Sequence, residues 1–159
     1  MLKFLDKHLE ESLLVILLSM MSLLIGAQVF MRYVMHDSLT WSEELARYCF
    51  IWATYLGVSC AVKHKAHICV EALTERLPNT ARHYVTILSY MLFIVFAVMV
   101  MKEGYALTVK VFGFGQKSSA MGLPMGYIYL APTVGFGLTI IRLLQSIFEE
   151  IKSMRKVGH

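Results

Sequence analysis

The polar cluster that most suggests a specific role lies between Thr40 and Tyr48, at the start of an apolar segment. Thr40 and Glu43 have the spacing of a capping box, in which a hydroxyl and a carboxylate three residues later satisfy free amides at a helix start. Glu43 and Arg47 are four residues apart, and Glu44 and Arg47 are three apart, so both carboxylates can reach the guanidinium along one helix face. The pattern predicts a helix that begins here and carries these charges on its first turns.

Two interpretations of this cluster stay open. The uncharged stretch at residues 48–62 is too short to cross a membrane alone, so we expect the charged turn at or just inside the membrane boundary. Charges at that depth are costly unless they are paired or face protein. The cluster is either an interfacial cap whose ion pairs satisfy each other, or a polar lock between helices or subunits that Arg32 joins. Ala53, Gly57 and Ala61 follow at four-residue spacing, and small residues let another helix approach closely.

The other reactive residue types offer little for a metal, a cofactor or a nucleophile. His64 and His67 have the i, i+3 spacing of metal ligands, but no third ligand is evident, and polar residues at the lipid headgroups are the favoured interpretation. The cysteines are Cys49, Cys60 and Cys69, without a C-x-x-C pair. We therefore expect no cofactor, no metal site and no enzymatic activity.

Four long apolar segments must position these residues. The uncharged stretches cover residues 12–31, 48–62, 84–101 and 118–141. About 20 helical residues cross the hydrocarbon core of a bilayer. Hydrophobic residues make up 57% of the chain and the mean hydropathy is +0.60, which is too apolar for an ordinary soluble domain. We predict an all-α integral membrane protein with a single domain of four transmembrane helices, near residues 12–33, 41–62, 82–102 and 122–148.

The basic residues are distributed unevenly over the two sides of this arrangement. If the four segments alternate in direction, ten Lys and Arg residues share the side of both termini and five lie on the other. The positive-inside rule then places both termini in the cytoplasm. Anionic lipid headgroups account for the basic excess, so no nucleic-acid partner is expected. Between the second and third segments, residues 68–77 suit a short amphipathic helix on the cytoplasmic surface, or the frayed end of the second segment.

Several blocks of sequence, in order along the chain, resemble one known family. They are QVFMRYV at residues 28–34, SLTWSEELARY at 38–48, KHKAHICVE at 63–71 ahead of Leu77-Pro78, and GLPMGYIY at 122–129. Over residues 28–144 the chain resembles the small, DctQ-like membrane subunit of tripartite ATP-independent periplasmic (TRAP) transporters. Cys69 departs from the small aliphatic residue expected at its position. Within the family, the chain looks close to the sialic-acid branch.

The resemblance implies a function that the residues alone do not reveal. In this family a periplasmic binding protein captures an acidic substrate and passes it to a large multispan membrane subunit, which carries the substrate and coupling sodium ions. The small subunit is a non-catalytic scaffold in the bacterial inner membrane. The implied partners are the large subunit, the binding protein and membrane lipids, and the implied substrate is a sialic acid or a C4-dicarboxylate. The candidate interface or helix-locking residues of this chain are Arg32, Trp41, Glu43, Glu44, Arg47, Gly57 and Ala61.

Two other classes of protein serve as alternatives. A four-span membrane redox enzyme of the quinone-linked disulfide type would need paired outward cysteines. A small exporter acting alone would need a carboxylate embedded in its first segment, and residues 12–31 contain none. The subunit interpretation fits better, because no acidic residue lies near the middle of any apolar segment.

Overall fold

The computed structural model describes residues 2–37, 39–64 and 79–157, which form four long helices. They are α1 (Leu2–Val34), α2 (Thr40–Lys63), α4 (Asn79–Gly113) and α5 (Gly126–Val157). Each contains a segment long and apolar enough to cross a membrane. The predicted all-α fold with four membrane-spanning helices is therefore confirmed. The amphipathic helix predicted at residues 68–77 lies outside the described residues.

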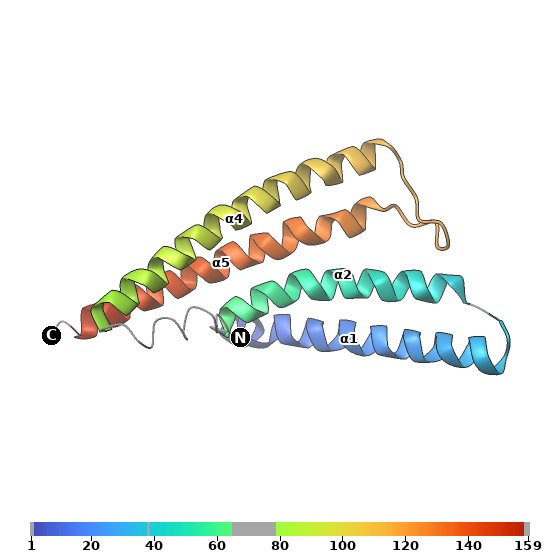
Figure 1. Ribbon diagram of the computed structural model, residues 1–159, viewed down its shortest axis with the longest axis horizontal. Coiled ribbons are helices and arrows are strands. Elements are labelled where there is room, and N and C mark those ends of the chain that lie inside the picture. Colours follow the sequence, from blue (N-terminus) through green and yellow to red (C-terminus); the bar gives the residue numbers. More distant parts are fainter. Residues whose placement is uncertain (1, 38, 65–78, 158–159) are drawn as a thin grey trace.

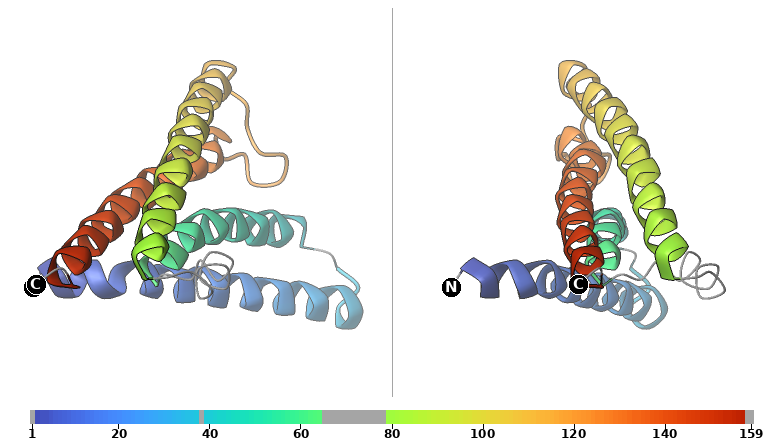
Figure 2. Two further views of the ribbon diagram at one scale, coloured as in Figure 1. Left: turned by 60° about the vertical axis from the view of Figure 1, so that its left-hand side comes forward. Right: turned by 90° about the vertical axis from the view of Figure 1, so that its left-hand side faces the viewer.

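The four helices form an open row rather than a closed bundle (Figure 1). α1 packs on α2, α2 on α5, and α5 on α4, and no other pair of these described helices brings its backbones together. Figure 2 shows α4 inclined to α5, while α1 and α2 run side by side. The chain therefore consists of two helical hairpins, α1–α2 and α4–α5, that meet along α2 and α5.

The place of a helix in the row decides how much of it is buried. In the most apolar part of α1 no residue is buried, and in that of α4 only 11% are, against 39% in α2 and 33% in α5. A membrane gives apolar side chains a favourable environment without burial in protein. The exposed apolar sides of α1 and α4 are thus compatible with lipid or with the helices of another protein.

The two hairpins approach each other closely at Gly135 of α5. A Cβ atom at this position would lie 2.7 Å from the backbone oxygen of Tyr55 in α2, closer than packed atoms come. Beside this contact, the rings of Tyr55 and Phe136 meet edge to face with their centroids 6.1 Å apart. The absence of a side chain at Gly135 therefore lets the two helix backbones touch.

Within the second hairpin, α4 supplies a hydrogen-bond donor to a turn of α5 that contains a proline. Pro132 lies inside α5 and has no backbone N–H. The Thr108 hydroxyl of α4 is 2.7 Å from the carbonyl oxygen of Tyr129 and 2.8 Å from that of Gly104. An added Cβ at Gly104 would lie 3.1 Å from Thr133 Oγ1, so this glycine also keeps α4 and α5 close.

Several helix boundaries differ from those expected from the apolar runs. α1 extends back to Leu2. α4 continues to Gly113 rather than ending near residue 102, so Lys102, Glu103 and Lys110 lie on a helix and not in a loop. α5 begins at Gly126 rather than residue 122, because residues 114–125 form a compact turn in which the Ser118 amide donates to the Leu123 carbonyl oxygen at 2.8 Å. Apolar composition alone did not distinguish this turn from a span.

Candidate functional site: polar contacts at the two ends of the helix row

Charged side chains form contacts at both ends of the row, which are named here by their position. The start of α1 and the end of α5 lie at the left-hand ends of their helices in Figure 1, and this side of the row is called the terminal end. The start of α2 and the turn at residues 114–125 lie at the other, called the loop end. Each end carries carboxylates that join elements distant in sequence.

At the loop end, Glu44 connects the first hairpin to the turn of the second. Its Oε2 accepts hydrogen bonds from the backbone amides of Ala120, at 2.9 Å, and Met121, at 3.2 Å. Its Oε1 accepts a hydrogen bond from the Tyr48 hydroxyl. The neighbouring Gly122 has a φ of +66°, a backbone conformation that glycine adopts without strain. Glu44 therefore fixes the turn between α4 and α5 to the N-terminal part of α2.

The exposed charges next to Glu44 form a looser contact. Arg47 Nη2 is 3.4 Å from Glu43 Oε1, and both side chains are more than half exposed. Gln28 of α1 also reaches this pair, with its Nε2 3.3 Å from Glu43 Oε2. In the part of the chain that the structure describes, no hydrogen bond or ion pair connects Arg32 to these residues. Gln28 therefore occupies the place that the sequence suggested for Arg32.

The predicted capping box at Thr40 is not formed, although the helix begins where it was expected. Thr40 is the first residue of α2, Leu39 is the N-cap, and no side chain caps the helix. The box requires its hydroxyl one residue before the helix. Instead, the Ser42 hydroxyl donates to the Leu39 carbonyl oxygen at 2.8 Å, and Glu43 turns toward Arg47.

The other candidate residues from the sequence, which are Trp41, Gly57 and Ala61, do not join the polar contacts around Glu43 and Glu44. Trp41 is exposed. An added Cβ at Gly57 would meet only Leu14 Cδ2 at 3.9 Å, and Ala61 is exposed. Within the described residues, the close approach between α2 and α5 occurs at Gly135 instead.

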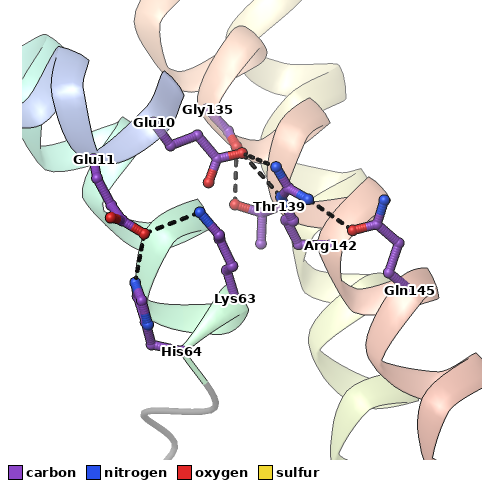
Figure 3. A network of polar contacts seen from close by, with 8 residues as sticks. All are labelled: Glu10, Glu11, Lys63, His64, Gly135, Thr139, Arg142 and Gln145. Atoms are coloured by element: carbon purple, nitrogen blue, oxygen red, sulfur yellow. Dashed lines mark hydrogen bonds and ion pairs between the residues drawn. The ribbon is translucent and has the colours of Figure 1, made fainter. Parts of the chain in front are cut away.

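At the terminal end, two adjacent carboxylates of α1 bind two different helices (Figure 3). Glu10 Oε1 is 2.9 Å from both Nε and Nη2 of Arg142 in α5, and these side chains are only 6% and 10% exposed. Glu11 Oε1 is 3.0 Å from Lys63 Nζ and 3.1 Å from His64 Nε2, at the end of α2. One pair of consecutive residues therefore joins α1 both to α2, its partner in the first hairpin, and to α5 of the second.

The Glu10–Arg142 ion pair spans two helices whose backbones are not in contact. Arg142 Nη1 also donates to Gln145 Oε1 at 2.8 Å, whereas Glu10 Oε2 is buried without a hydrogen-bond partner among the described residues. A buried charge depends strongly on its partner, because the survivor of a broken pair keeps its desolvation penalty. A further pair joins α4 to α5, with His83 Nδ1 and Glu150 Oε1 2.6 Å apart.

Sequence reasoning treated Arg142 only as a charge that sets topology, and it did not single out Glu10. A signal was present, because Glu10 and Glu11 directly precede the first uncharged stretch and Arg142 directly follows the last. In four alternating helices these positions fall on the same side of the membrane. Opposite charges at the same depth are candidates for pairing.

Among the described residues, the polar contacts are ion pairs and hydrogen bonds that hold helices together, and they do not form a reaction centre. Cys49 and Cys60 are free thiols on one helix. In the described ranges, no three side chains of the His, Cys, Asp or Glu type gather in a way that could hold a metal ion. The polar groups are mostly engaged with other parts of the same chain, which suits a structural role.

Comparison with known proteins agrees with this description. The family model for the DctQ component of tripartite ATP-independent periplasmic transporters matches residues 21–153. The chain is 31% identical over 157 residues to the isethionate TRAP transporter permease protein DctMQ of Oleidesulfovibrio alaskensis, which covers 95% of this chain but 25% of that protein. It is 27% identical to the sialic acid TRAP transporter small permease protein SiaQ of Vibrio cholerae, over 99% of this chain and 90% of that one.

A shorter likeness concerns a longer permease. Over 58 residues the chain is 40% identical to the sialic acid TRAP transporter permease protein SiaT of Haemophilus influenzae, covering 36% of this chain and 9% of that protein. The chain thus spans a quarter or less of the long permeases and most of the length of SiaQ. Because the family model covers most of the sequence, and because the fold has four helices able to span a membrane, this chain belongs to the DctQ family of TRAP transporter small permease subunits, which are transporter components and not enzymes.

Proposed function

We propose that this chain is a non-catalytic scaffold that braces a large multispan permease in a sodium-coupled, binding-protein-dependent importer of an organic acid. The observation that carries the proposal is the open row, which leaves the apolar sides of α1 and α4 uncovered. The isethionate permease supports it, because the region similar to this chain is there a quarter of a longer permease chain. Here the same four helices would pack against a separate large subunit.

The distribution of charge supports a bracing role over a transporting one. Ion pairs and hydrogen bonds fasten the two hairpins at both ends of the row, while residues 12–31 and 84–101 carry no charge at all. Ion and substrate sites inside membranes are built from polar groups that face a cavity. We therefore assign sodium and substrate binding to the large subunit.

The position and surroundings of the subunit form part of the same proposal. Both termini lie in the cytoplasm, the chain resides in the bacterial inner membrane, and the loop end faces the periplasm and its substrate-binding protein. The transported compound belongs to the sialic acid or C4-dicarboxylate class, which is supported by the names of relatives such as SiaQ and DctQ of Vibrio cholerae. The loop-end residues Arg32, Trp41, Glu43, Glu44 and Arg47, with Gly57 and Ala61 on α2, form the candidate contact surface for the large subunit.

Co-purification and transport test the proposal directly. The tagged chain, expressed with the large permease subunit and solubilised in mild detergent, should retain it in a one-to-one complex. Liposomes that contain the chain alone should take up no organic acid under a sodium gradient, whereas the chain, the large subunit and the binding protein together should. Uptake by the chain alone, or purification without the large subunit, would contradict the scaffold role.

Single-cysteine labelling tests the orientation separately. Ser119 and Lys152 are exposed at opposite ends of the row. In a background without native cysteines, an impermeant reagent should label Ser119→Cys in intact cells with a permeabilised outer membrane, and Lys152→Cys only after the inner membrane is opened. The reverse pattern would show that the termini face the periplasm.

A further inference from the structure

A cavity of about 530 Å³ lies between α2 and α5 at the loop end. Its lining changes in character along α2. Near the turn it is lined by Arg47, Gln116 and Lys117, and farther along the helix by Ile51, Tyr55 and Pro132. The volume is that of a typical small-molecule site. The cavity therefore joins a cationic rim to an apolar interior.

The cationic rim has charge to offer to a ligand. Lys117 is exposed, and its ammonium group makes no hydrogen bond or ion pair within the described ranges. Arg47 contacts Glu43 through Nη2 only, at 3.4 Å. Glu44 also lines the cavity, but its carboxylate already accepts hydrogen bonds from Tyr48, Ala120 and Met121. Two cations at the rim thus keep N–H groups to donate to a ligand, whereas the oxygens of Glu44 already accept hydrogen bonds within the chain.

The change in polarity matches the depth profile of a membrane surface. From Arg47 to Tyr55 the helix rises about 12 Å, at about 1.5 Å per residue. Over that distance the bilayer passes from phosphate groups to hydrocarbon. Basic pockets between transmembrane helices are suited to lipid headgroups, because the phosphate is held where the protein offers cations.

We propose that this cavity binds one phospholipid molecule, with its phosphate on Arg47 and Lys117 and an acyl chain against Ile51, Tyr55 and Pro132. A phospholipid supplies an anion and a hydrocarbon chain at the required depths in one molecule. A helix of the large subunit would match the apolar wall, but it would need its own acidic residues opposite both cations. The lipid site goes beyond the proposed scaffold role and does not depend on it.

Native mass spectrometry of the purified full chain tests the site. Titration with a phosphatidylethanolamine carrying palmitoyl and oleoyl chains should give one adduct that survives where further adducts dissociate. Replacing both cations, with Arg47→Gln and Lys117→Gln together, should weaken this binding at least about tenfold, as expected for lost charge-assisted hydrogen bonds. The exposed Lys110→Gln, a cation outside the cavity, is the matched control and should bind as the unmutated chain does.

Two further variants separate the acyl-chain contact from the phosphate contact. Ile51→Trp fills the cavity and should remove the adduct, while Leu92→Trp, on an exposed apolar position of α4, should not. Circular dichroism checks that each variant keeps its helices. Lys117→Gln alone changes an exposed turn residue that need not affect folding, so it should weaken binding several-fold on a fully folded chain. Unchanged binding in this variant would overturn the proposal.

Competition and crosslinking exclude the other occupants. Glycerol 3-phosphate has the same phosphate without acyl chains and should not displace the lipid at equal concentration; displacement would show a bare anion site. In the complex with the large subunit, a benzoylphenylalanine at position 51 should crosslink to lipid. A crosslink to the large subunit instead would show that a protein helix fills the cavity. The titration and competition experiments use the chain alone, so their outcomes do not bear on whether it assembles with a permease.

Discussion

The terminal end and the loop end fasten the same two hairpins with different chemistry. At the terminal end, Glu10 and Arg142 form an ion pair in which both side chains are 10% exposed or less. At the loop end, Glu44 binds backbone amides of the turn, and the neighbouring pair of Glu43 and Arg47 lies in the open. One end therefore relies on two buried charges, and the other on one carboxylate and the backbone.

This difference indicates at which end substitutions should destabilise the fold most. A buried pair fails when either partner is removed, because the remaining charge has no water to replace the lost partner. When a carboxylate near the surface is removed, water can accept the hydrogen bonds of the backbone amides in its place, at a modest cost in free energy. We expect substitutions at the terminal end to disturb the whole fold and those at the loop end to act locally.

The largest expected effect comes from Arg142→Met, which leaves the buried Glu10 carboxylate unpaired. Loss of one member of a buried pair typically destabilises a protein by about 3–5 kcal/mol. The measurement is the thermal unfolding midpoint of the full chain in detergent, with Lys110→Met as an exposed control. Glu10→Leu with Arg142→Leu should recover most of the loss, since neither charge then remains. A melting curve of Arg142→Met like that of the unmutated chain would show that the terminal end is no more vulnerable than the loop end.

The second-largest effect is expected at Gly135, in the middle of the row. It tests whether the contacts at the two ends are enough to hold the hairpins together. Gly135→Ala would place a methyl group against the Tyr55 backbone, and forced overpacking costs about 1–3 kcal/mol. The control is Gly26→Ala in α1, because an added Cβ there meets nothing within 4 Å and alanine favours a helix. A lower unfolding midpoint for Gly135→Ala and not for Gly26→Ala is expected. Equal midpoints would mean that the polar ends hold the hairpins without help from the close contact.

A smaller effect is expected from Glu44→Ala, and it should be confined to the loop end. The change removes the acceptor of the Ala120 and Met121 amides, so the turn should open more often. We expect several-fold faster labelling of a cysteine at Ser119, with less loss of unfolding temperature than for Gly135→Ala. Glu43→Ala, one residue away, is the control and should label as the unmutated turn does. A global drop in stability as large as that of Arg142→Met would show that both ends are equally critical.

The smallest effect on the isolated chain is expected from Arg47→Ala. Exposed ion pairs contribute about 0.2–1 kcal/mol, so the unfolding midpoint should barely change. Co-purification of the large subunit should nevertheless fall below that of Lys110→Ala if the loop-end cluster contacts the partner. Normal assembly and transport of Arg47→Ala would leave the cluster as an interfacial cap within this chain.

The sequence predicted the helices well because the bilayer leaves few choices to an apolar segment. Backbone groups in lipid must be hydrogen-bonded within the segment, so each apolar run becomes a helix. The ends of the helices were harder to predict, because at residues 103–113 and 118–125 the composition is compatible with both a helix and a turn. There, a specific contact such as Glu44 with the Ala120 amide decides the outcome.

Whether a contact in the site could be predicted depended on how far apart its two residues are in the sequence. The Glu43–Arg47 pair was predictable because helix geometry places residues four apart on one face. The Glu10–Arg142 pair joins residues more than a hundred positions apart, and it depends on the order α1, α2, α5, α4 in the row. Nothing in local spacing specifies that order. The contacts that fasten the hairpins were therefore the ones that sequence reasoning missed.

The length of α4 has a mechanical consequence for the surrounding membrane. Its candidate membrane span, His83–Gly113, has 31 residues, of which Lys102, Glu103 and Lys110 are charged. At about 1.5 Å per residue it rises about 46 Å, against about 30 Å for the hydrocarbon core. A helix with this mismatch must tilt, protrude or thicken the bilayer. Because α4 is also inclined to α5, the two helices cannot both stand along the membrane normal.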